Sequence, residues 1–137
     1  MGQQQLLLLV LGVIIVGFAV VVGINAFSTQ QVKANADALT GTAFRLANDI
    51  QTWAAKPDIY GGLNGWSNIN GGSFDFASLG LPAGDSYTDE DGTYTVSGSA
   101  GTVIITAEST NQESNTVVVT VSGPSADDIS AAVTYGS

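Results

Sequence analysis

The distribution of apolar residues along the chain separates an N-terminal segment from all that follows. From Leu6 to Ile24 the sequence contains only apolar residues and glycine. A helix rises about 1.5 Å per residue, so a helix over this run is about 28 Å long, close to the thickness of the hydrocarbon layer of a membrane. The apolar part of a signal peptide is shorter, about 7–15 residues. Residues 1–24 are therefore predicted to form an apolar helix buried by lipid or by other copies of itself.

Residues 25–56 keep a helical period but become amphipathic. Apolar residues recur at spacings of four and three, which is typical of a helix that packs one stripe against a partner. Pro57 disfavours the helical conformation at Lys56 and ends the run. We expect one helix over residues 3–56, about 80 Å long, whose second half buries this stripe under a sheet. The stripe consists of Val32, Ala36, Leu39, Ala43, Leu46, Ile50 and Trp53.

Residues 57–137 predict a small β-rich head. Residues 58–92 are rich in glycine, asparagine and serine but hold large apolar side chains, so they are interpreted as a long ordered connection whose aromatic residues pack in the core. Residues 129–135 predict a further strand, with a short helix after Ser125 as the alternative. The fold class is α+β: a long N-terminal helix under a small antiparallel sheet. Three segments with alternating apolar residues form the predicted meander, at 93–98, 102–108 and 116–122.

Charge and cysteine content limit the partners of the head. The net charge is −9, and the only basic residues are Lys33, Arg45 and Lys56, so the chain beyond residue 56 is purely acidic. Without a basic patch, direct nucleic acid binding by the head is not expected. The acidic head predicts a solvated outward face. Because the chain has no cysteine, packing on the helix, contacts with neighbouring subunits or a bound ion must replace disulfides.

Catalytic chemistry finds little support in the sequence. There is no histidine to activate a serine and no glycine-rich phosphate motif, so neither an enzyme nor a cofactor is expected. One acidic cluster, containing Asp85, Asp89 and Asp91, has the oxygen ligands that calcium takes. Its spacing does not match an EF-hand, and acidic residues before a glycine are common in turns. We therefore predict a turn and no metal, with a calcium site as the alternative.

The residues before the apolar run carry no charge. Signal peptides and N-terminal anchors normally have lysine or arginine at this place, whereas here Met1 and Gly2 are followed by three glutamines. We expect a mature chain from which a short basic leader has been removed. No small-residue cleavage site follows the apolar run, so this run is expected to stay in the mature protein.

Together, the uncharged N-terminus, the apolar run, its amphipathic continuation and the β-meander head resemble bacterial type IV pilins, most strongly over residues 1–56. The resemblance implies that a prepilin peptidase removes the leader before Met1, whose amine is often methylated in the family. It also implies that subunits wait in the inner membrane until assembly machinery extracts them into an extracellular helical filament of identical subunits. Registration and subunit packing would then fall on Met1, Gln3, Gln4, Gln5, Leu6, Leu9, Val13, Val16 and Val20.

Two features depart from the family pattern. Most members carry a glutamate at position 5, which neutralises the terminal amine of a neighbour, whereas Gln5 accepts a hydrogen bond but cancels no charge. The helix-bending proline of the family is also missing, so any unwinding falls to Gly12, Gly17 and Gly23. The alternative is that these glycines only permit close helix packing.

The expected function is that of a structural subunit of a type IV pilus-like filament, which provides adhesion, motility or DNA uptake at the level of the whole fibre. One alternative is a pseudopilin of a type II secretion system, working in a short filament. Another is a single-pass membrane anchor that displays a binding head.

Overall fold

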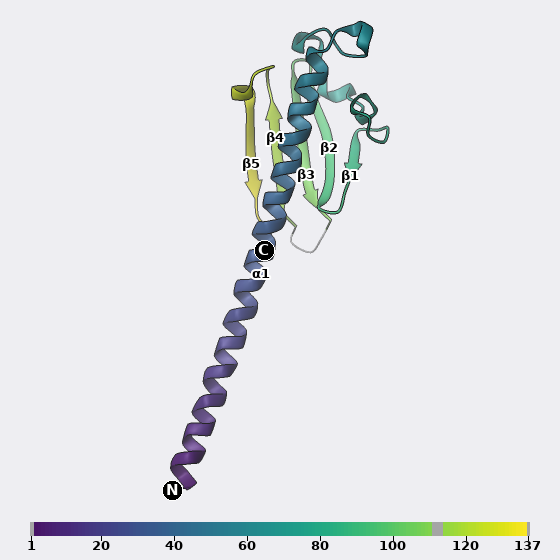
Figure 1. Ribbon diagram of the computed structural model, residues 1–137. Coiled ribbons are helices and arrows are strands. Elements are labelled where there is room, and N and C mark those ends of the chain that lie inside the picture. The colour runs from purple at the N-terminus through teal and green to yellow at the C-terminus, as the bar shows by residue number, and fades with distance from the viewer. Residues whose placement is uncertain (1, 111–113, 137) are drawn as a thin grey trace.

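The protein consists of one long helix and a head that packs around its C-terminal half. The computed structural model describes residues 2–110 and 114–136. Helix α1 spans Gly2–Ala55. Its N-terminal half projects away from the head, and its C-terminal half crosses one face of the sheet (Figure 1). The predicted α+β layout is therefore confirmed.

The sheet is an antiparallel meander with the order β1-β2-β3-β4-β5. The predicted segments match β2, β3 and β4 with bounds that differ by one residue, and the segment at 129–135 is a strand preceded by a 3₁₀ turn at Ala126–Asp128. The connection at 58–92 contains four 3₁₀ turns and an edge strand that its sequence did not reveal. The strands are β1 Ser86–Thr88, β2 Gly92–Ser99, β3 Thr102–Ser109, β4 Thr116–Val121 and β5 Ile129–Thr134.

The hairpin between β2 and β3 depends on glycine. Ser99 pairs with Thr102, so only Ala100 and Gly101 form the loop, and Gly101 has a φ of 78°. Left-handed backbone of this kind is typical of tight hairpins and favours glycine. At Gly98 a Cβ would lie 2.3 Å from the carbonyl oxygen of Thr102, so the close approach of the two strands also requires glycine.

The core lies between α1 and the inner face of the sheet. On β3 and β4, alternate residues are fully buried and partly exposed, as expected for a sheet with one face covered. The aromatic residues of the connection extend this core: ring centroids are 5.5 Å apart between Trp53 and Phe74 and again between Phe74 and Phe76. Phe76 is fully buried. The predicted core role is therefore confirmed for Phe74 and Phe76, and Trp66 packs half-buried against this core. It is wrong for Tyr60, which is 69% exposed.

Candidate functional site

The first candidate site is the apolar half of α1, which no other part of the described chain covers. All large apolar residues from Leu6 to Ile24 are between 48% and 69% exposed, and the most apolar 18-residue window of the helix is 0% buried. By length and composition this helix is able to cross a membrane. The predicted packing residues Leu6, Leu9, Val13, Val16 and Val20 all lie on this exposed segment.

The polar residues at the start of α1 are equally open. Gln3, Gln4 and Gln5 lie in the first turns of the helix, and all three are exposed. Met1, to which the registration role was assigned, lies outside the described residues.

The three glycines of the apolar half do not interrupt the helix. α1 is continuous through Gly12, Gly17 and Gly23, and a Cβ at any of them would meet no atom within 4 Å. Packing within this chain therefore gives no reason for glycine at these positions. The remaining physical reasons are close approach of a neighbouring helix and the weak helix propensity of glycine.

The amphipathic half of α1 brings the predicted stripe onto the sheet. Val32 and Trp53, at the two ends of the stripe, are half-buried because the sheet ends there. The indole nitrogen of Trp53 donates a hydrogen bond to the carbonyl oxygen of Gly61 at 2.8 Å, which ties the helix end to the following loop. The five residues between the ends are fully buried: Ala36, Leu39, Ala43, Leu46 and Ile50.

A clamp that the sequence did not reveal fixes the point at which α1 leaves the head. Asn115 is only 1% exposed. Its side-chain nitrogen donates to the carbonyl oxygen of Val32 at 2.8 Å and to Oδ1 of Asn35 at 3.0 Å, while its Oδ1 accepts from the backbone nitrogen of Gly136 at 2.9 Å. The side-chain nitrogen of Asn35 in turn donates a hydrogen bond to the carbonyl oxygen of Asp91 at 3.2 Å. One buried amide thus joins the helix, the sheet and the C-terminal segment.

The acidic cluster is used as a turn. Oδ1 of Asp89 accepts hydrogen bonds from the backbone nitrogens of Asp91 and Gly92, at 2.9 and 3.0 Å. Among the described residues, no group of three or more acidic side chains is placed to hold a metal ion. The structure therefore does not assemble Asp85, Asp89 and Asp91 into a ligand set, and turn chemistry accounts for Asp89.

The two carboxylates with lowered pKa values also organise loops. The pKa of Asp75 is lowered because its Oδ1 accepts from the backbone nitrogens of Ala77 and Gly84. The pKa of Asp128 is lowered by the hydroxyl and backbone nitrogen of Ser125. Both carboxylates therefore have a local structural role.

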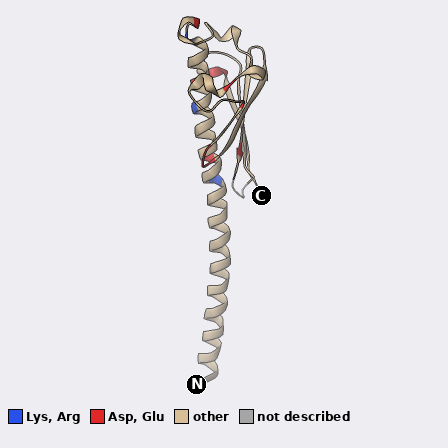
Figure 2. Ribbon diagram, turned by 90° about the vertical axis from the view of Figure 1, so that its right-hand side faces the viewer, with Lys and Arg blue, Asp and Glu red and all other residues tan. Residues whose placement is uncertain are grey.

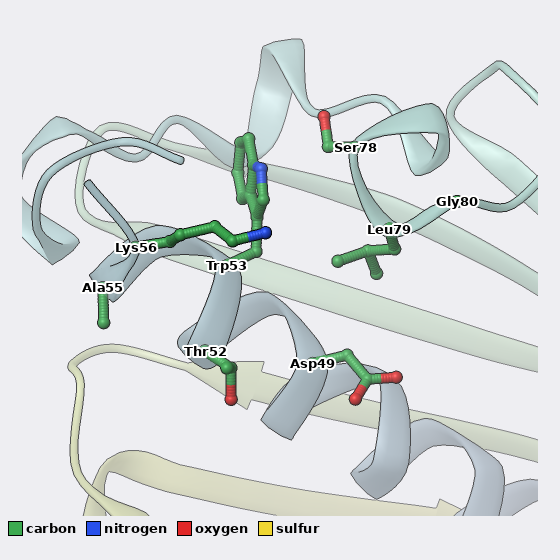
Figure 3. Close-up of a pocket in the computed structure, with 8 residues that line it drawn as sticks. All are labelled: Asp49, Thr52, Trp53, Ala55, Lys56, Ser78, Leu79 and Gly80. Carbon is green, nitrogen blue, oxygen red and sulfur yellow. The ribbon is translucent and has the colours of Figure 1, made fainter. Parts of the chain in front are cut away.

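A groove lies at the C-terminal end of α1 (Figure 3). It is an open hollow between the helix end and the turn that carries Ser78 and Leu79. Lys56 extends across it from the helix side, and the indole of Trp53 forms one wall. The hydroxyl of Thr52 bonds to the carbonyl oxygen of Asn48 within the helix. The groove is open surface, and we assign no chemistry to it.

The three basic residues lie on α1 or directly after it, whereas acidic residues occur both on α1, at Asp37 and Asp49, and in the head. Figure 2 shows red residues on the helix as well as over the head. The helix-and-sheet layout matches the pilin-like fold class.

No family model matches the chain, and neither a curated protein nor a solved structure matches it.

Proposed function

We propose that this protein is a structural subunit that polymerises through its N-terminal helix into an extracellular type IV pilus-like filament. The observation that carries the proposal is the open apolar half of α1, which forms one continuous helix with the half that the head packs on. A helix that is apolar on all sides needs a dry environment, and the head covers none of it. Neighbouring copies of the same helix supply that environment in a filament, and lipid supplies it before assembly.

The remaining expectations belong to this proposal. The subunit waits in the inner membrane, a prepilin peptidase trims it, and the assembly machinery moves it into the fibre without catalysis or a cofactor of its own. The acidic head faces solvent on the outside of the fibre, where like charges favour solubility. Gln3, Gln4 and Gln5 supply hydrogen bonds between neighbouring helix ends, and the three helical glycines allow close approach or local unwinding during extraction.

Electron microscopy of fibres sheared from producing cells, with mass spectrometry of the N-terminus of the fibre protein, tests the proposal. Thin fibres built from a chain that begins at Met1 are the expected result. Recovery of the protein only as a membrane-bound monomer that retains a leader would overturn it and favour the single-pass anchor. Short fibres confined to the cell envelope would instead favour the pseudopilin.

A further inference from the structure

One end of the head carries a turn that holds two large apolar side chains in solvent. This upper turn is the 3₁₀ turn Asp58–Tyr60, which follows directly after the C-terminal end of α1. Ile59 is 85% exposed and Tyr60 is 69% exposed. Single exposed apolar residues are common on protein surfaces, but a contiguous exposed apolar patch marks an interaction site more often.

Several contacts hold the upper turn in place. The backbone nitrogen of Tyr60 donates to the carbonyl oxygen of Pro57 at 3.0 Å, and that of Gly61 donates to the carbonyl oxygen of Asp58 at 2.9 Å. The indole of Trp53 anchors Gly61 to the helix. Because the backbone is fixed, docking of these side chains orders little additional chain, which favours binding.

The opposite end of the head carries a hollow of about 290 Å³. This lower hollow lies where α1 emerges from the head, beside the C-terminal segment (Figure 1). Lys33 lines it, and Tyr135 contributes an aromatic side chain that is 56% exposed. The full lining is Ser28, Thr29, Val32, Lys33, Tyr135 and Gly136.

An apolar strip on β5 continues the surface of the lower hollow. Val133 pairs with the buried Val117 of β4, so the two side chains lie on the same face of the sheet. Val133 is nevertheless 38% exposed, and it lies on β5, an edge strand of the sheet. The apolar surface therefore extends beyond the hollow itself.

The two ends carry opposite charges beside apolar surface. The upper turn presents apolar side chains beside the carboxylate of Asp58, and the lower hollow presents apolar surface beside the ammonium of Lys33. Lys33 is one of three basic residues in a chain of net charge −9, so this is one of few places where the acidic head attracts another head. Contact between different surfaces at opposite ends is head-to-tail and repeats along a fibre.

We propose that the upper turn of one copy docks into the lower hollow of the next copy along the filament. Asp58 pairs with Lys33 across the contact, and the side chains of Ile59 and Tyr60 pack against Tyr135. The partner is a second copy of this chain, and the inference rests on the filament proposed above.

Disulfide formation between introduced cysteines tests the contact, because the chain has no cysteine of its own. Ser28→Cys and Ile59→Cys are combined in one full-length chain, which leaves Lys33, Asp58 and Tyr60 intact. Ser28 lies about 40 Å along α1 from the helix end, whereas a disulfide requires Cα atoms within about 7 Å. Any disulfide between the two positions must therefore join different copies.

Oxidised fibres of this variant are expected to give a ladder of covalent multimers on a non-reducing gel. The matched control replaces Ile59→Cys with Thr95→Cys, an exposed position on β2, and is expected to give no ladder. Adding Asp58→Lys should abolish the ladder, and adding Lys33→Asp to that variant should restore it. Circular dichroism confirms that each variant keeps the folded head.

The outcomes separate this contact from the filament itself. If fibres form normally but give no ladder above that of the control, the proposed contact is refuted and the proposed filament is not. A ladder that survives Asp58→Lys overturns the charge pairing. If the natural chain forms no fibres at all, the proposed function fails, and this inference fails with it.

Discussion

Removal of the Tyr94 hydroxyl is expected to stabilise the head. Tyr94 is fully buried on β2. The side chains of Thr42 and Asp89 lie near its Oη, but among the described residues none meets it with hydrogen-bond geometry. A buried polar group without a partner costs about 1–3 kcal/mol. Tyr94→Phe keeps the ring and its packing, so we expect the free energy of unfolding to rise by about 1 kcal/mol. In a domain of about 60–100 residues this raises the Tm by about 4–8 °C.

The assay is thermal unfolding of the full chain in detergent micelles, followed by tryptophan fluorescence, because Trp66 lies in the head and Trp53 of α1 packs against Phe74 of the head. Tyr87→Phe is the matched control. Tyr87 stacks on Tyr94 with ring centroids 6.0 Å apart but is only half-buried. Loss of its hydroxyl should therefore change stability by less than about 0.5 kcal/mol. A loss of about 1 kcal/mol or more on Tyr94→Phe would show that the hydroxyl is bonded and refute the reasoning.

The raised pKa of the Tyr94 hydroxyl predicts that the stability of the head falls at alkaline pH. Burial raises the pKa of Tyr94 from 10.0 to about 12, and the nearby side chain of Thr42 offsets only part of this rise. The unfolded chain therefore releases the proton near pH 10, while the folded chain retains it until about pH 12. Stability is full below pH 10 and falls as the pH rises from 10 towards 12. Tyr94→Phe should lack this loss, and an unchanged alkaline profile would contradict the assignment.

Three further predictions concern the packing and the loops of the head. Leu46→Ala should lower the free energy of unfolding by about 2–5 kcal/mol, measured by urea titration, because the side chain is fully buried against the sheet. Asn115→Ala should lower it by about 2 kcal/mol and speed hydrogen exchange at the amide of Gly136, because that amide loses its acceptor. Asp75 and Asp128 have pKa values below the ordinary 3.8. Their contribution to the free energy of unfolding is therefore present above pH 3.8 and is lost as the pH falls below that value. The combined Asp75→Asn and Asp128→Asn variant should show a flatter acid dependence of the urea midpoint.

The sequence predicted those parts of the fold that a regular period encodes. The alternation of β3 and β4 and the stripe of α1 follow from spacing alone, since each element has enough residues to show its period. The edge strand Ser86–Thr88 has only three residues, too few for any period, and it forms because the turn at Asp89 returns the chain against β2.

The parts of the candidate site that could not be predicted depend on where distant segments meet. Asn115 is a clamp only because residues 83 and 80 positions away lie within hydrogen-bond distance. Ile59 and Tyr60 belong to a connection whose other large apolar residues are buried or half-buried, and nothing in their local sequence distinguishes the exposed pair. The lower hollow likewise joins α1 to the far end of the chain.

The exposed half of α1 also bears on the energetics of the proposed transfer from membrane to fibre. From Leu6 to Phe27, 16 large apolar residues are open in the isolated subunit, and their burial is worth on the order of 20 kcal/mol or more. This exceeds the stability of a typical domain, about 5–15 kcal/mol, so the helix must be covered at every stage. Lipid and neighbouring helices are, however, equally apolar, so transfer from one to the other changes the hydrophobic term little. In the proposed filament, the free energy of assembly therefore comes from close packing at small residues and from contacts between heads, such as the proposed pair of Asp58 and Lys33.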